Sequence, residues 1–226
     1  MDEFISLLAH DLRTPLTSIR GYAQLLLRRR HEQTALDPHI ASGLQTIIAQ
    51  SDRLGTMTSL LLDISRVRLG RVALRRGPVD LGIVTQAVIA SWSETHGGEL
   101  ALEGHLDGLV VNADGIRVQQ VIRSMLDFVS LRPGGASPPA IALSKHDGQA
   151  FVVVTDEGEP LPEGVRARLF DQLVTGQEND AGWQLAQPEL YIARGVTEAH
   201  GGRLVAESPL PERDNGLRVS MLIPLT

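Results

Sequence analysis

The sequence of 226 residues contains no cysteine, which excludes disulfide bonds, thiolate catalysis and cysteine-based metal sites. Lysine occurs once, at Lys145, and the net charge is -6, so a nucleic-acid-binding surface is not expected. No apolar run approaches the roughly 18 to 20 residues that span a bilayer, so no membrane segment is expected either. The hydrophobic fraction of 42% is enough for a real core, and the length favours two domains.

The stretch from Phe4 to Leu26 has the pattern of an amphipathic helix. Its apolar or helix-compatible positions alternate in steps of three and four, as in a coiled coil: Ile5, Leu8, Leu12, Pro15, Ile19, Tyr22 and Leu26. His10 lies off this stripe, where an uncharged imidazole in water could act as a nucleophile near neutral pH. The carboxylate of Asp11 could fix the tautomer of that imidazole by accepting a hydrogen bond from one ring nitrogen.

Residues 10–16 read His-Asp-Leu-Arg-Thr-Pro-Leu and resemble, at all seven positions, the phosphoacceptor box of two-component sensor histidine kinases. The resemblance implies that His10 is phosphorylated, that Asp11 activates it, and that Thr14 helps to position water when a partner is dephosphorylated. With Arg13 of the same box, these are the candidate catalytic residues. A response regulator receiver domain is the implied partner, and the implied location is cytoplasmic.

Only nine residues precede His10, which leaves no room for a sensor segment ahead of the helix. We therefore expect Met1 to open a fragment of a longer protein with an upstream sensor domain.

A second helix is expected from Asp37-Pro38, an N-cap followed by proline at the first helical position, to about Val67. Its apolar residues keep a near-heptad spacing: Ile40, Leu44, Ile47, Leu54, Met57, Leu61 and Ile64. The two helices can pack as an antiparallel hairpin, but a hairpin buries too little by itself. The pattern and the resemblance together predict a homodimer held by a four-helix bundle.

The heptad pattern ends in a segment with Gly70, Gly77 and Pro78. We predict a dimerisation and phosphoacceptor domain over residues 1–70, a linker over 71–78 and a second domain over 79–226. In the second domain the patterns predict helices over 81–92, 114–131 and 190–200, a strand over 108–111, and hairpins over 140–155 and 203–223. The expected fold class is α+β, a helical hairpin in a dimeric bundle followed by an α/β sandwich. By resemblance the sandwich is of the histidine kinase ATPase type.

The second domain resembles the ATP-binding domain of the same kinases, but its first nucleotide motif is altered. The run before this motif is kept, with matches at Asp114, Arg117, Gln120 and Val121. Where the family has two asparagines four residues apart, this chain has Ser124 and Phe128. The second asparagine is the magnesium ligand of the family, and a phenyl ring cannot replace its oxygen.

The two later nucleotide motifs are also incomplete. Asp156 and Gly158 keep the Asp-x-Gly motif whose carboxylate reads adenine in the family, while Pro160 replaces the second glycine. Gln187-Pro188-Glu189 stands where two further glycines are expected, and Glu189 would repel a triphosphate. The adenine end is therefore the part that could still bind nucleotide.

Three functions from different classes remain open. The first is an ATP-dependent histidine autokinase, which would need ATP and magnesium. The second, which we favour because the His10 box is intact, is phosphotransfer with a response regulator or its dephosphorylation, without ATP. The third is a non-enzymatic dimeric scaffold. No cofactor is assigned under the second or third function.

The heptad stripe predicts that the chain is a parallel homodimer in solution, because the two helices of residues 2–67 need a second copy to bury their apolar faces. Light scattering at micromolar concentration should give twice the 24.5 kDa of the chain. A stable monomer at that concentration would contradict the prediction.

Overall fold

The computed structural model describes residues 16–27, 38–97, 100, 102–104, 108–132, 138–171 and 188–226. The chain divides into two compact units, Met1–Leu69 and Gly70–Thr226. The phosphoacceptor box, with His10, Asp11, Arg13 and Thr14, lies outside the described residues, and so do Asp37 and Gln187. Both units are described below, each by itself.

The described residues of the first unit form two helical segments, residues 16–27 and α2 (Pro38–Arg68). The predicted second helix is confirmed, with Pro38 as its first residue and an end one residue beyond Val67. The buried residues of α2 are Ala41, Leu44, Ser51, Thr58, Leu62 and Ser65. Four of these six are small or hydroxylated. Ala23 on the first segment is also buried, and Arg20 pairs with Asp52 at 3.0 Å.

The apolar stripe of the first unit is exposed in the single chain. Its side chains are between 42% and 70% exposed at Ile19, Tyr22, Leu26, Ile40, Ile47, Leu54, Met57 and Leu61. Leu44 is the member of the α2 stripe that is buried. Within the chain α2 thus buries mainly small residues together with Leu44 and Leu62, and most of its large apolar stripe is left for another surface. Such exposure fits the homodimeric four-helix bundle that is typical of the family suggested by the sequence.

The second unit is built around a five-stranded sheet with the strand order β2-β4-β5-β7-β6 among the described residues. Neighbouring strands are antiparallel except for the parallel pair of β2 and β4. The strands are β2 (Leu102–Gly104), β4 (Ala140–His146), β5 (Gln149–Asp156), β6 (Arg203–Glu207) and β7 (Leu217–Pro224). Two further strands, β1 (Gly77–Asp80) and β3 (Val110–Ala113), pair separately.

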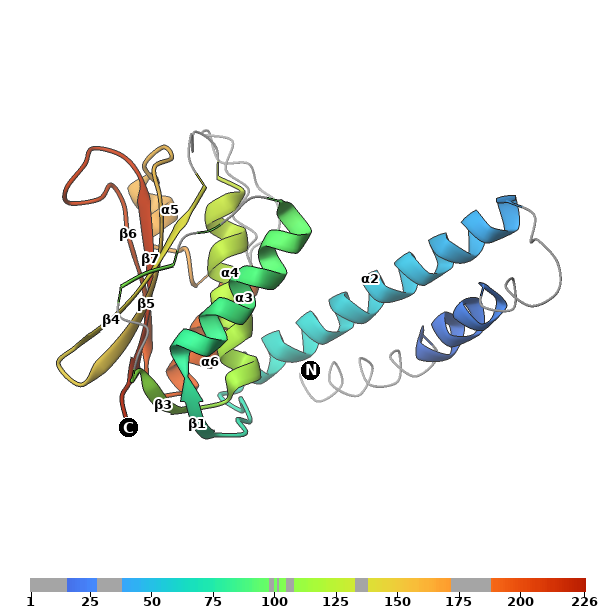
Figure 1. Ribbon diagram of the computed structural model, residues 1–226, viewed down its shortest axis with the longest axis horizontal. Helices are drawn as coiled ribbons and strands as arrows, with labels where there is room; N and C mark the ends of the chain where they lie inside the picture. Colours follow the sequence, from blue (N-terminus) through green and yellow to red (C-terminus); the bar gives the residue numbers. More distant parts are fainter. Residues whose placement is uncertain are drawn as a thin grey trace. The chain divides into compact units, whose positions relative to one another are not determined.

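Three helices lie on one face of this sheet, α3 (Leu81–His96), α4 (Gly115–Ser130) and α6 (Pro188–Ala199), as Figure 1 shows. A short helix, α5 (Glu163–Arg166), follows β5. The expected α/β sandwich with helices on one face of a mixed sheet is therefore confirmed.

Local signals place most of these elements correctly. The carboxylates of Asp80 and Asp114 accept hydrogen bonds from the first-turn amides of α3 and α4, so both are N-caps. Asp147 and Gly148 both have positive φ and form the tight turn between β4 and β5. Two predicted bounds were wrong: α3 continues from residue 92 to His96, and the strand predicted over 108–111 runs from Val110 to Ala113. The sequence did not predict β1, β2 or α5.

The alternation of β5 positions the candidate site. Every second residue of this strand is buried, at Ala150, Val152, Val154 and Asp156. The first three are apolar and the fourth is a carboxylate at the end of the strand. Since side chains of a strand alternate between faces, the same two-residue period that builds the core places Asp156 among buried residues.

A buried histidine joins α6 to the start of α4. The Nε2 atom of His200 accepts a hydrogen bond from the amide of Asp114 at 2.9 Å, and its Nδ1 atom lies 2.8 Å from the carbonyl of Val196. An imidazole that accepts at Nε2 and donates at Nδ1 is neutral. Burial lowers the pKa of His200, against a smaller opposing effect of the hydrogen bond to Val196. Arg76 and Asp114 are the charged neighbours that also act on it, in opposite directions.

His200 should make the stability of the second unit pH-dependent. Its pKa is lower in the folded than in the unfolded chain, so below about pH 6.5 the unfolded state binds more protons and stability falls. The loss should not exceed about 1.4 kcal/mol per pH unit. Trp92 lies in α3 of this unit, so urea unfolding of the full chain followed by tryptophan fluorescence between pH 7.5 and 5.5 measures it.

The matched control for this prediction is the exposed histidine at the end of β4. His200→Gln should flatten the pH dependence, whereas His146→Gln should leave it unchanged, because the side chain of His146 is 78% exposed. Equal pH profiles for the wild type and His200→Gln would contradict the assignment.

Candidate functional site

The altered first motif lies on the second half of α4. Ser124 and Phe128 are one helical turn apart, and both are buried, with 9% and 7% of their surface exposed. The hydroxyl of Ser124 donates to the carbonyl of Gln120 at 2.9 Å and is thus engaged within the helix. Phe128 contributes an apolar ring, whose full burial is worth roughly 1.5 to 3 kcal/mol. At these two positions the chain therefore has a packing role where the related motif has amide side chains.

A cavity of about 590 Å³ lies beside these residues. Its described lining comes from α3, α4 with the residue that follows it, and the start of α6: Trp92, His96, Ser124, Asp127, Phe128, Ser130, Leu131 and Glu189. The rings of Trp92 and His96 are stacked with centroids 4.3 Å apart, and Trp92 Nε1 donates to Asp127 Oδ1 at 3.0 Å. This described lining holds two carboxylates and three aromatic rings but no lysine or arginine.

The start of α6 adds to the acidic character of this region. A helix N-terminus attracts anions through its free amides and dipole, but α6 begins with Pro188, which has no N–H. Glu189 follows in the first turn, so its own carboxylate already meets the positive end of the dipole. A polyphosphate prefers cationic side chains, and the described lining of this cavity supplies two carboxylates but no lysine or arginine, so it does not fit the phosphates of a nucleotide.

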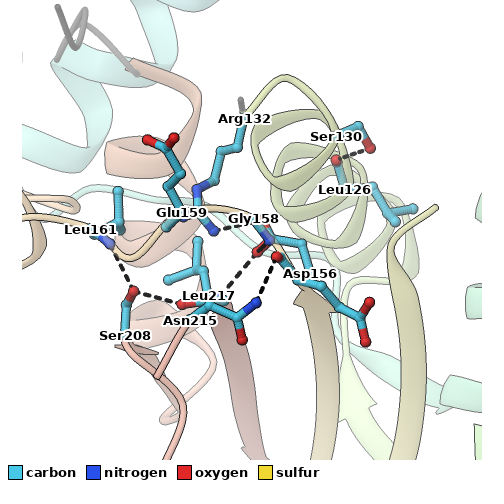
Figure 2. Close-up of polar contacts among 12 residues, drawn as sticks. Leu126, Ser130, Arg132, Asp156, Gly158, Glu159, Leu161, Ser208, Asn215 and Leu217 are labelled. Carbon is cyan, nitrogen blue, oxygen red and sulfur yellow. Dashed lines mark hydrogen bonds and ion pairs between the residues drawn. The ribbon is translucent and has the colours of Figure 1, made fainter. Parts of the chain in front are cut away.

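The other end of the candidate site is centred on the carboxylate of Asp156. Its Oδ1 atom accepts hydrogen bonds from the amides of Gly158 and Leu217, each at 3.0 Å. Its Oδ2 atom forms an ion pair with Arg132 at 2.5 Å. Figure 2 shows the three donors around this carboxylate. The two charged side chains are only 2% and 5% exposed, so the ion pair is shielded from water.

Arg132 comes from the residues that follow α4 and reaches the end of β5, 24 residues further along the chain. A second nitrogen of its guanidinium donates to the backbone carbonyl of Glu159. Burial lowers the pKa of Arg132, and the charge of Asp156 opposes this effect. Sequence reasoning missed Arg132, because its only local signal is a basic residue just after an apolar helix, which is a common helix ending.

The loop after Asp156 is held against the β6–β7 connection. The hydroxyl of Ser208 donates to the carbonyl of Gly216 at 2.6 Å and accepts from the amide of Leu161 at 2.8 Å. The amide of Gly216 donates to the carbonyl of Gly158 at 2.7 Å. Gly216 has φ of 84°, and a Cβ there would lie 2.6 Å from the carbonyl oxygen of Asp156, so only glycine fits. These hydrogen bonds thus hold the loop after Asp156 against the β6–β7 connection.

Comparison with known proteins agrees with this architecture. Residues 1–70 match the His Kinase A (phospho-acceptor) domain, and residues 113–226 match the histidine kinase-, DNA gyrase B-, and HSP90-like ATPase family. The chain belongs to the sensor histidine kinase family and comprises the transmitter core of such a protein, as the sequence predicted.

Among its relatives are the probable sensor histidine kinase TcrY of Mycobacterium tuberculosis and the sensor protein DivL of Caulobacter vibrioides, each 26% identical. The alignment with TcrY covers 91% of this chain and 43% of TcrY, and that with DivL covers 99% and 28%. The chain thus spans less than half the length of these relatives. The solved structure of full-length ShkA in complex with AMPPNP has the same fold, with a TM-score of 0.77 at 23% identity, over 100% of this chain and 46% of ShkA.

The described residues show neither a metal-binding cluster nor a membrane-spanning helix. Those residues contain no cluster of three or more histidine or acidic side chains that could hold a metal ion. None of the helices in the described part of the chain is long and apolar enough to cross a membrane.

We predict that the chain binds ATP with magnesium weakly or not at all. Phe128, Asp127 and Glu189 line the cavity, and the carboxylate of Asp156 is already bound by Arg132. Isothermal titration calorimetry of the full chain should give no dissociation constant in the micromolar range. Phe128→Asn by itself should not restore binding, because the acidic cavity and the ion pair remain. Ordinary micromolar binding by the wild-type chain would contradict the prediction.

Proposed function

We propose that this chain is a two-component signalling module that performs phosphoryl chemistry with a response regulator at His10 and does not depend on ATP. The observation that carries the proposal is the acidic and aromatic lining of the cavity beside Phe128. That lining offers no lysine or arginine to the phosphates of a nucleotide and its carboxylates would repel them, whereas the seven-residue box around His10 is intact. The site for the regulator is therefore kept without a matching site for ATP.

The proposed transfer needs no nucleotide because a phosphorylated regulator aspartate is an activated acyl phosphate. A neutral ring nitrogen of His10 attacks the phosphorus, the P–N bond forms, and the P–O bond to the regulator carboxylate breaks. Asp11 keeps the attacking nitrogen unprotonated by accepting a hydrogen bond from the other ring nitrogen. The products are phosphorylated His10 and a free regulator carboxylate.

The alternative reaction at the same box is hydrolysis of the regulator phosphate. In this reaction Thr14 and Asp11 position a water molecule, which attacks the phosphorus and yields inorganic phosphate and the free carboxylate. Positioned acid or base help of this kind contributes typically 10² to 10⁴ in rate. Both reactions use the same partner, so a response regulator receiver domain is the proposed partner in either case.

An ATP-dependent autokinase remains the second candidate, favoured by the carboxylate of Asp156 and by the family fold. It requires nucleotide to enter the second unit, so the calorimetry described above separates it from the first proposal. A scaffold without enzymatic activity requires neither nucleotide nor regulator phosphate.

The test of the proposed function uses a panel of labelled, phosphorylated response regulators mixed with the full-length chain in the absence of ATP. At least one regulator should lose its label faster than it does alone. His10→Ala should abolish transfer to the chain, and Thr14→Ala should mainly slow hydrolysis, because Thr14 lies off the apolar stripe. If no regulator loses phosphate faster with the wild type than with both variants, the enzymatic proposal fails and the scaffold is favoured.

A further inference from the structure

The carboxylate of Asp156 is held in place by more than its ion pair with Arg132. Two backbone amides, from Gly158 and Leu217, already bind Oδ1 and connect the end of β5 to its own loop and to β7. The guanidinium binds the opposite oxygen, Oδ2, and contributes nothing to these strand contacts. Removing the guanidinium would therefore leave both amide bonds in place.

The guanidinium also uses a second acceptor at the same place. One of its nitrogens donates to Asp156 Oδ2 and the other to the carbonyl of Glu159. A carboxylate oxygen and a carbonyl oxygen thus face one planar group that donates N–H bonds in its own plane. This is an arrangement that binds a flat N–H donor, and Arg132 is a donor of that kind attached to the chain.

We propose that Arg132 is a built-in occupant of the base-binding end of the second unit, and that it determines specificity by excluding external flat N–H donors such as an aminopurine. The assignment of Asp156 as the base-reading carboxylate rests on its match to the Asp-x-Gly motif of the family. Arg132 would thus block the adenine end by itself, independently of the cavity beside Phe128, whose described lining lacks cations for phosphates.

Burial explains why the exclusion is strong. Both charged groups are almost completely shielded from water, so an external donor must displace a desolvated guanidinium from a desolvated carboxylate. The displaced guanidinium must also give up the carbonyl of Glu159. The tethered group loses no translational freedom when it occupies the site, whereas a free ligand does.

The test is adenosine binding to the full-length chain, because adenosine has the planar amino group but no phosphate. Arg132→Ala should bind adenosine at least tenfold more tightly than the wild type. Adenosine should raise the melting temperature of this variant in a concentration-dependent manner. Magnesium ATP should bind no more tightly than adenosine, since the cavity beside Phe128 is unchanged.

Matched controls separate a vacant donor site from general loosening. Arg132→Met fills most of the volume without an N–H group and should not bind adenosine, and Arg203→Ala removes an exposed arginine from β6 of the same unit. Inosine carries a carbonyl where adenosine carries the amino group, so it should bind Arg132→Ala at least tenfold more weakly. Equal binding of adenosine by the wild type and Arg132→Ala, or equal binding of inosine and adenosine, would overturn the proposal.

Arg132→Ala leaves a buried carboxylate without its cation and could be too unstable to fold by itself. In that case millimolar adenosine should restore its fluorescence-detected folding, and Arg132→Ala/Asp156→Asn should fold without ligand but not bind adenosine. The amide nitrogen of that asparagine is itself a donor and faces the donor of the base. Failure of adenosine to bind the folded single variant or to restore the unfolded one contradicts the proposal. Adenosine carries no phosphoryl group, so this result is independent of the regulator experiment.

Discussion

The second unit depends on the compensation of one buried carboxylate. The two-residue period of β5 carries Asp156 into the row of buried positions that Ala150, Val152 and Val154 begin. A charge in that position is costly unless it is paired and hydrogen-bonded. The chain supplies two amides and one guanidinium, and these donors come from three places: the loop after β5, the start of β7 and the end of α4. The geometry of this whole end of the domain therefore follows from the requirements of a single side chain.

The opposite end of the same region has a different balance of charge. Asp127 accepts a hydrogen bond from Trp92, Glu189 is exposed in the first turn of α6, and no cation belongs to the described lining of the cavity between them. A buried carboxylate is thus neutralised inside the protein, while two more accessible carboxylates remain available to water. An anionic ligand would meet repulsion at the accessible end and an occupied acceptor at the buried end. The acidic cavity and the ion pair both disfavour an anionic ligand, although they share no residue.

Elements that depend on a few neighbouring residues could be predicted from the sequence. Contacts between residues far apart in the sequence could not. The start of α2 at Pro38, the cap of α4 at Asp114 and the turn at Asp147 each depend on a few neighbouring residues, so the sequence indicates them directly. β1 was missed because Gly77 and Pro78 are typical of a linker, and only pairing with β3, over thirty residues away, makes them a strand. In the candidate site the identities of Phe128 and Glu189 could be interpreted from the sequence. The pairing of Arg132 with Asp156 could not, because it depends on how α4 packs on the sheet.

The buried charge of the second unit and the exposed apolar stripe of the first unit differ in how they can be compensated. In the second unit, the buried carboxylate of Asp156 is already paired with Arg132, so no ligand is needed to compensate its charge. In the first unit, α2 buries mainly short side chains within the chain, whereas large apolar residues such as Ile47 and Leu61 remain about half exposed. Apolar area of this kind is stabilising only when another apolar surface covers it. The exposed stripe fits the dimeric bundle that is typical of the family, whereas the charge of Asp156 is compensated within the second unit.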